Sequence, residues 1–187
     1  MDYATLKTSS THYSGVFYNN SVAMMNMGSW FIATQIEKVK SGESQATNWG
    51  IVKYPHPEGV EAGTTLGTIT SLAVNQKSEH KEAALDFMKF VTGEDGAAVI
   101  ASTGTIPAIK NDEVVSSITS IDGFPTDENS KEALNTVQTY LEMPMHEKSA
   151  DIEVILNEAH DNIMTKNVSI DQGLKDMNTR VQQLLNN

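Results

Sequence analysis

The stretch AMMNMGSWF, residues 23–31, decides how we interpret the fold of this chain. It begins as an apolar, methionine-rich run, breaks at Gly28-Ser29 and continues into a tryptophan. We expect residues 22–27 to form a buried strand that ends at the break. The apolar spacing over residues 30–42 then predicts a helix that a glycine terminates. The chain therefore passes from a strand into a helix within a few residues.

Trp30 stands at this strand-to-helix junction. In α/β proteins, ligands sit outside the carboxyl ends of the strands. An indole there can stack on the apolar face of a sugar or another flat ligand. Gly28 would let the backbone approach closely, and Ser29 can donate or accept a hydrogen bond. The alternative is a tryptophan packed in the core with its N–H group satisfied.

The rest of the chain mixes strands with helices. Strands are predicted at 51–54 and, with an interruption at Gly67, at 64–75. Residues 105–113 should be extended around Pro107, and residues 111–129 should be polar and rich in turns. Helices are predicted at 78–93, 94–104, from Ser130 to a break at Pro144, at 151–164 and from Ser169 onward. This order indicates the α/β or α+β class.

Caps and apolar faces refine these helix predictions. Ser78 should cap the helix that follows it, and Ser169 with Gln172 should form a capping box. Trp49 is interpreted as a core residue. The helices are expected to bury Ala84, Phe87, Met88 and Val91, then Leu134, Val137 and Leu141, and finally Leu174, Met177, Val181 and Leu184.

Composition excludes several classes of function. The chain has 187 residues, a formal net charge of −11 and no cysteine. The acidic balance argues against binding to nucleic acid or to an anionic membrane surface. The lack of cysteine excludes disulfides, thiol catalysis and thiolate metal sites. No apolar run approaches a membrane span of roughly 20 residues, and no signal peptide is visible. We expect either a cytoplasmic protein or a chain that lacks its natural start.

No catalytic or metal-binding motif stands out. The five histidines stand apart in the sequence, and no pair has the spacing of a helical zinc site. A glycine-rich phosphate loop and a GxSxG motif are both absent from the sequence. Asp151 and Glu153 lie at the start of a predicted helix, where acidic side chains suit the helix dipole. The sequence therefore predicts no catalytic residue, no metal ligand and no cofactor.

Five segments together resemble a known family. GVFYNNSVAMMNMGSW, residues 15–30, resembles the F-x-x-G-x-x-A-M-x-x-x-G-x-W segment of the extracellular solute-binding proteins that serve carbohydrate ABC importers. Four further segments resemble the family in the same order: WGIVKYPHPEG (49–59), GTITSLAVNQKSEHKEAALDFMKFVTGEDG (67–96), STGTIPA (102–108) and VSIDQGLKDMNTRVQQLL (168–185). The chain departs from the family in EMPMHEKSADIEV, which lacks the aromatic residues that members often carry there.

The resemblance implies part of a type II periplasmic-binding-protein-like fold, with two α/β lobes around a cleft. It covers the C-terminal half of a member. Residues 1–68 and 125–187 would then form the C-terminal lobe, and residues 72–112 would belong to the N-terminal lobe. The resemblance also implies an extracellular or periplasmic protein at the cell surface, which can be lipid-anchored. The membrane anchor would lie outside this chain.

The implied function is capture of a carbohydrate between the lobes and delivery to the permease subunits of an ABC transporter, without catalysis. The expected ligand-binding residues are Gly28, Ser29 and Trp30, followed by Gly67, Thr68 and Asp151. For Gly67 and Thr68 the alternative is a strand bulge at the hinge. Two other functions stay open at this point. One is a glycan-active enzyme, which needs two carboxylates across a cleft, and the other is an interaction domain without a ligand.

Overall fold

A computed structural model describes residues 2–143 and 145–186 of the chain. This part of the chain is helix-rich α/β, as the sequence predicts. It divides into two compact units: unit 1 comprises residues 1–12 and 141–187, and unit 2 comprises residues 13–140. Pro144, where we expected a helix to break, lies outside the described residues.

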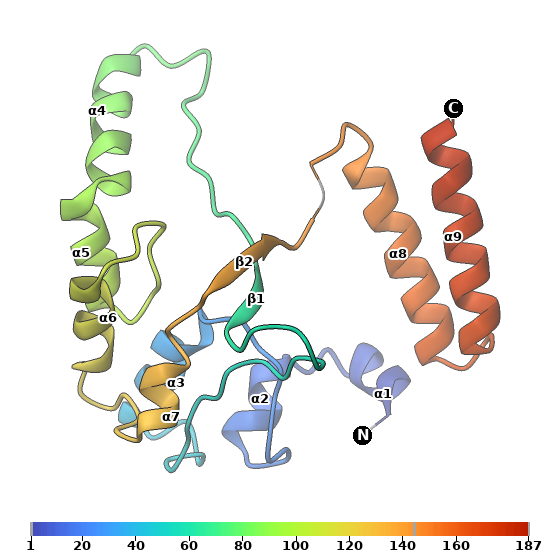
Figure 1. Cartoon of the computed structure of the whole chain (residues 1–187), viewed down its shortest axis with the longest axis horizontal. Helices are drawn as coiled ribbons and strands as arrows, with labels where there is room; N and C mark the ends of the chain where they lie inside the picture. Colours follow the sequence, from blue (N-terminus) through green and yellow to red (C-terminus); the bar gives the residue numbers. More distant parts are fainter. Residues whose placement is uncertain (1, 144, 187) are drawn as a thin grey trace. The chain divides into compact units, whose positions relative to one another are not determined.

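Unit 2 is built around one apolar core. Its elements are α2 (Tyr13–Tyr18), α3 (Phe31–Lys40), β1 (Thr64–Gly67), α4 (Lys81–Thr92), α5 (Glu94–Ser102), α6 (Asp112–Thr119), α7 (Glu128–Glu132) and β2 (Gln138–Leu141), with β1 and β2 paired in a sheet (Figure 1). The buried core side chains are Ile32, Ile36, Ala101, Val114, Ile118, Phe124 and Leu134. Each large aliphatic residue among them contributes about 1.5–3 kcal/mol by its burial. This core fixes α3, and with it the position of Trp30 at its start.

Unit 1 is a helical hairpin with one short helix added. It contains α1 (Tyr3–Thr8), α8 (Ser149–Met164) and α9 (Ile170–Asn186), and Figure 1 shows α8 and α9 side by side. The two long helices are antiparallel, because Nζ of Lys148 before α8 donates to the carbonyl of Leu184 near the end of α9 at 2.8 Å. Near the turn, α9 approaches α8 closely at Gly173, which is buried against Ile163.

An ionic cluster holds α1 against α8. The Tyr3 hydroxyl and the Lys7 ammonium both donate to the carboxylate of Asp161, the latter at 2.9 Å. The ring of Tyr3 also packs edge-on against His160, with centroids 5.3 Å apart. The hydrogen bond from Tyr3, followed by that from Lys7, lowers the pKa of Asp161 below its ordinary value. This cluster ties the first residues of unit 1 to its last segment.

Most of the helix predictions are confirmed. The helix predicted at 30–42 is α3, and Gly42 follows it with a positive φ of 76°. The predicted pair at 78–93 and 94–104 is α4 and α5, and the last two predicted helices are α8 and α9. Ser169 accepts a hydrogen bond from the backbone N–H of Gln172 at 3.2 Å, as a capping residue should. Of the segment predicted to be extended, 105–113, residues 105–111 are non-helical as expected, whereas residues 112 and 113 already begin α6.

Most of the strand predictions are wrong. Residues 22–27 and 51–54 form no strand, and the predicted strand at 64–75 is reduced to β1. A strand needs a neighbour to accept its backbone hydrogen bonds. Within residues 2–143 and 145–186, the sheet consists of β1 and β2 alone. Residues 22–27 are also largely exposed, so that the apolar pattern does not correspond to burial here.

Two predictions between residues 111 and 141 are also wrong. The polar, turn-rich segment contains α6, which Asn111 caps by accepting from the N–H of Val114 at 2.8 Å. The helix expected from Ser130 is only the short α7, and residues 138–141 form β2 instead. Threonine and aromatic side chains favour the strand there, and the N–H of Val137 already donates to the carbonyl of Gly63 at 3.0 Å.

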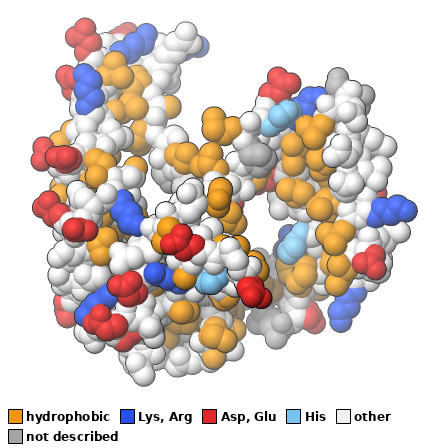
Figure 2. Space-filling view, viewed as in Figure 1, with side chains coloured by type: hydrophobic (Ala, Val, Ile, Leu, Met, Phe, Trp, Pro, Cys, Tyr) orange, Lys and Arg blue, Asp and Glu red, His pale blue; other side chains and the backbone are white. Residues whose placement is uncertain are grey.

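Three details of the predicted helix ends and faces are corrected as well. Ser78 does not cap α4, because its hydroxyl accepts from the N–H of His80, one residue before the helix begins. Leu174 is exposed rather than buried, whereas the buried residue of α9 is its neighbour Gly173, which lies against Ile163 of α8. Phe87 of α4 is 64% exposed, and no residue of this fully described helix is buried. Figure 2 shows hydrophobic side chains along α4.

Candidate functional site

The segment Gly28–Phe31 forms the turn that opens α3. The N–H of Phe31 donates to the carbonyl of Gly28, and the N–H of Ile32 donates to that of Ser29, both at 3.1 Å. Trp30 occupies the cap position with helical angles, φ −57° and ψ −21°, and its side chain makes no capping hydrogen bond. The indole is therefore not needed to begin the helix.

The indole of Trp30 lies against Gly28 and remains half open to solvent. A Cβ atom on residue 28 would be 2.1 Å from Cζ3 of the ring, a distance that no real contact allows. The tryptophan is nevertheless 52% exposed. Ser29 beside it is exposed as well. The ring thus contacts the backbone at Gly28 and is otherwise half open to solvent. Trp30 is therefore not the core tryptophan of the alternative interpretation.

Aromatic packing fixes the residue that follows. The ring of Phe31 stacks on Tyr18 with an interplanar angle of 13° and meets Phe17 edge-on, with centroids 5.6 Å apart in each pair. Such pairs contribute about 0.5–1.5 kcal/mol beyond the burial of area. Phe31, directly after Trp30, is therefore held against α2.

A buried polar clamp fixes the middle of α3. Gln35 is fully buried, and its Nε2 donates to the carbonyl of Ala46 at 2.8 Å. The hydroxyl of Ser44 donates to Oε1 of Gln35 at 3.4 Å. The loop after α3 is therefore folded back on the helix, which keeps α3 in place and holds Trp30 on a rigid element.

The Gly28–Trp30 segment carries no charge of its own. The shifted groups of unit 2 lie elsewhere. The hydrogen bond from Lys38 lowers the pKa of Glu43 below its usual range, and hydrogen bonds from Ser130 do the same for Asp127. An uncharged aromatic surface with a hydroxyl beside it suits a neutral ligand that combines apolar and hydroxyl groups.

Gly67 has a packing role in the sheet. It ends β1, and a Cβ atom there would be 2.6 Å from Cγ2 of Thr139 in β2. Thr68 follows immediately and is exposed. The glycine thus allows a close approach of β2. A role of these two residues in ligand binding stays a prediction.

Asp151 is in unit 1, whereas the other predicted site residues are in unit 2. It lies in the first turn of α8 and is exposed. A carboxylate in this position stabilises a helix through its dipole, and any contact with a ligand stays a prediction. Trp49, in unit 2, is partly buried and packs against the core, as expected.

The sequence analysis did not single out Tyr54. This side chain is 58% exposed, and its hydroxyl accepts a hydrogen bond from Nδ2 of Asn26 at 3.4 Å. Asn26 is only two residues before Gly28. The local signal for it is an aromatic residue just before a proline, but the pattern at 51–54 predicts a strand instead.

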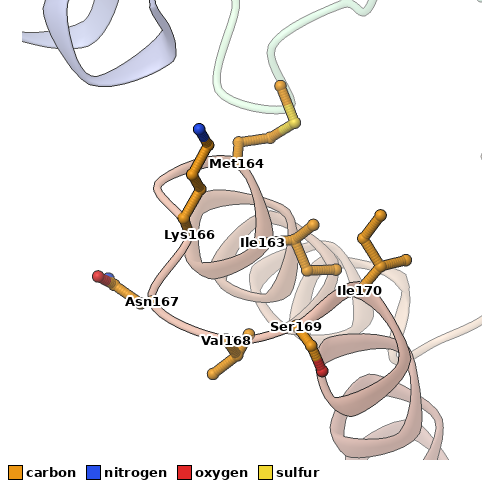
Figure 3. Close-up of a pocket in the computed structure, with 7 residues that line it drawn as sticks. All are labelled: Ile163, Met164, Lys166, Asn167, Val168, Ser169 and Ile170. Carbon is orange, nitrogen blue, oxygen red and sulfur yellow. The ribbon is translucent and has the colours of Figure 1, made fainter.

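A hollow of about 600 Å³ lies at the α8–α9 turn and contains none of the predicted site residues. Figure 3 shows its lining, which is mainly aliphatic apart from Lys166, Asn167 and Ser169. Among residues 2–143 and 145–186, no group of three metal-ligating side chains gathers. No helix in this part of the chain is both long and apolar enough to span a membrane.

Comparisons with known proteins agree with the resemblance. Residues 2–118 match the sequence profile of the bacterial extracellular solute-binding proteins. The crystal structure of a sugar transporter from Rhizobium etli, in an open conformation, is similar with a TM-score of 0.81 and 56% sequence identity. The match covers 97% of this chain and 46% of that one, so our chain spans less than half the length of this relative. No curated protein gives a significant match.

The architecture is accordingly that of part of a solute-binding protein, helix-rich α/β, as the resemblance implies. The family match covers more than half of the chain and includes the Gly28–Trp30 segment. This chain belongs to the bacterial extracellular solute-binding proteins.

Proposed function

We propose that the protein captures a carbohydrate outside the cell between two lobes and delivers it to the permease subunits of an ABC importer. Membership of the extracellular solute-binding family supports capture outside the cell. The Rhizobium etli relative is described as a sugar transporter, which supports the ligand class. In this proposal the lobes close by hinge motion and exclude water, which strengthens the polar contacts to the ligand.

The exposed face of Trp30 is the observation that carries the proposal. Its ring stands at the start of α3 and lies against Gly28, yet it is half open to solvent. Exposure of so large an aromatic surface has no structural benefit by itself, because its burial would stabilise the fold. The C–H face of a sugar ring would cover it, while the Ser29 hydroxyl bonds to a sugar hydroxyl. Gly67, Thr68 and Asp151 are secondary contact candidates.

We further propose that the capture is non-catalytic. The residues assigned to the ligand are mainly a ring, a hydroxyl and glycine backbone, which can hold a sugar but supply no acid–base pair. The ligand would then leave the site chemically unchanged. Chromatography of the sugar after incubation separates this from a glycan-active enzyme, since new products would show turnover.

The lobe assignment forms part of the proposal. Residues 1–68 and 125–187 would belong to the C-terminal lobe, and residues 72–112 to the N-terminal lobe. The exposed apolar side chains of α4, including Phe87 and Phe90, support it, because the N-terminal lobe would cover them. A structure of the full-length protein tests this assignment: α4 must there pack against residues that precede this chain.

Binding measurements test the function. We would screen the full-length protein by calorimetry against neutral mono- and disaccharides, then compare Trp30→Ala with the control Trp49→Phe. Trp49 packs against the core and is not assigned to the ligand. Trp30→Ala should weaken the best-bound sugar at least about tenfold, as expected for a central aromatic contact, while Trp49→Phe should retain affinity. Unchanged affinity in Trp30→Ala would overturn the assignment of the site.

A further inference from the structure

A second exposed aromatic ring lies beside the segment that carries Trp30. We propose that Tyr54 is a further ligand-contact residue, and that the site takes a sugar of at least two rings, one on Trp30 and one on Tyr54. This inference rests on the proposed function and deepens it. It concerns residues of unit 2 only.

The first step is the contact between the two chain segments. The Nδ2 atom of Asn26 lies 3.4 Å from the hydroxyl of Tyr54, although the residues are 28 positions apart in sequence. Asn26 also precedes Gly28 by two residues, a distance of at most about 7 Å between their Cα atoms. The Trp30 ring lies directly on Gly28, so the tyrosine hydroxyl and the indole both contact the short segment of residues 26–28.

The second step is that Tyr54 sits at the end of an anchored segment. The N–H of Ile51 donates to the buried hydroxyl of Ser130 at 2.8 Å, and Ile51 packs against the core. Nζ of Lys53 lies 3.7 Å from the carboxylate of Glu132. Pro55 follows the tyrosine and restricts its backbone further. The ring is therefore presented by a fixed backbone rather than by a loose loop.

The third step is the chemistry of the pair. Tyr54 is 58% exposed and offers a flat ring with a hydroxyl, and Asn26 adds an exposed amide. Rings stack on the C–H faces of sugars, whereas the hydroxyl and the amide exchange hydrogen bonds with sugar hydroxyls. Two exposed rings on neighbouring segments, with the Asn26 amide beside one of them, match a chain of sugar units better than a single unit. Asn26, Trp30 and Tyr54 are uncharged, which fits a neutral saccharide.

The test distinguishes two questions: whether the protein binds sugars at the Trp30 site, and whether a second sugar ring contacts Tyr54. We would measure affinities of the full-length protein for glucose, galactose and xylose and for maltose, cellobiose, lactose and xylobiose. The variants are Trp30→Ala, Tyr54→Ala and the control Tyr140→Ala, whose side chain is equally exposed at 58% but lies in β2. Circular dichroism confirms that each variant is folded.

We expect Tyr54→Ala to weaken the best disaccharide at least about tenfold and to change monosaccharide affinity less than about twofold. Trp30→Ala should weaken both classes, and Tyr140→Ala neither. Wild-type affinity of Tyr54→Ala for disaccharides, with Trp30→Ala impaired, would overturn this inference and leave the proposed function standing. Equal losses for mono- and disaccharides in Tyr54→Ala would overturn the two-ring site. Failure of the wild type to bind any of these sugars would contradict the proposed function itself.

Discussion

The six-membered ring of Trp30 lies where a side chain on Gly28 would have to be, 2.1 Å from an ideal Cβ position. The sequence suggested that Gly28 serves a close approach of the backbone to a ligand. The structure gives it a different use, since the glycine makes room for the indole itself. The orientation of the Trp30 ring therefore depends on residue 28 being a glycine, which has no side chain to displace the ring.

Gly28→Ala should displace the indole at little cost in stability. The clashing atoms are the far end of an exposed side chain, which can rotate away. Alanine also lowers the conformational entropy of the unfolded chain, which stabilises the fold by about 0.4–1 kcal/mol. We expect a free energy of unfolding within about 1 kcal/mol of the parent value, with stronger acrylamide quenching of Trp30. The measurement uses a Trp49→Phe background, so that Trp30 is the single tryptophan of this chain and can be excited selectively.

Gly15→Ala is the matched control, since a Cβ at residue 15 of α2 meets nothing within 4 Å. It should leave the quenching unchanged. If Gly28→Ala also leaves the quenching unchanged and lowers stability by more than about 2 kcal/mol, the backbone moves instead of the ring. The proposal that the position of the Trp30 ring depends on Gly28 would then be wrong.

Gln35→Ala should destabilise unit 2 strongly. The variant leaves the buried carbonyl of Ala46 without its donor and opens a void beneath the loop that follows α3. An unsatisfied buried group costs about 1–3 kcal/mol, and the void adds to this, so we expect a loss of about 2–4 kcal/mol. Urea unfolding followed by circular dichroism measures it. Thr34→Ala, at the exposed neighbouring position of the same helix, should stay within about 0.5 kcal/mol of the parent.

The stability of the α7 region should decrease in acid through Asp127. This carboxylate caps α7 by accepting from the N–H and the hydroxyl of Ser130, at 3.0 and 2.7 Å, and these bonds lower its pKa from 3.8. A lowered pKa means that the contribution is complete above pH 3.8 and is lost as the pH falls through the lower folded-state value. Asp127→Asn should retain a cap but lose this part of the pH dependence.

Urea unfolding between pH 2 and 6 gives the comparison between Asp127→Asn and the parent protein. Ser130→Ala serves as the companion variant, because it removes the hydroxyl donor and keeps the carboxylate. Its acid-dependent loss should begin near the same pH but be smaller and end at a higher pH than in the parent, because without the hydroxyl donor the pKa of Asp127 is lowered less. Identical pH profiles for the parent and for Asp127→Asn would contradict the assigned role.

Local patterns predicted the helices well, because a helix satisfies its backbone within its own segment. α3, α8 and α9 each combine an apolar stripe with a usable end signal, such as Gly42 or Ser169. α6 carried the same kind of signal in Asn111, Val114 and Ile118, but the polar residues around it obscured the pattern.

The strands could not be predicted as reliably, because a strand depends on a neighbour that the local sequence does not specify. The apolar runs at 22–27 and 51–54 look like strands but have no ladder, whereas β2 forms where a helix was expected. The same limit applies to the site. The exposed Trp30 could be anticipated from its junction with α3, but Tyr54 depends on its contact with Asn26, 28 positions away in sequence.

Gly173→Ala should weaken the packing of α8 on α9. An ideal Cβ there would be 2.4 Å from Cγ1 and 2.6 Å from Cδ1 of Ile163. Alanine improves helix propensity by about 1 kcal/mol, but overpacking of a close helix contact costs about 1–3 kcal/mol. We expect a net loss of about 1 kcal/mol or more, measured by urea unfolding of the helical signal. Ile163→Ala provides the matching change, because it removes the atoms that clash. The double variant should therefore lose less stability than the sum of the two single variants, whereas strict additivity would show that the two residues are not in the tight contact described here.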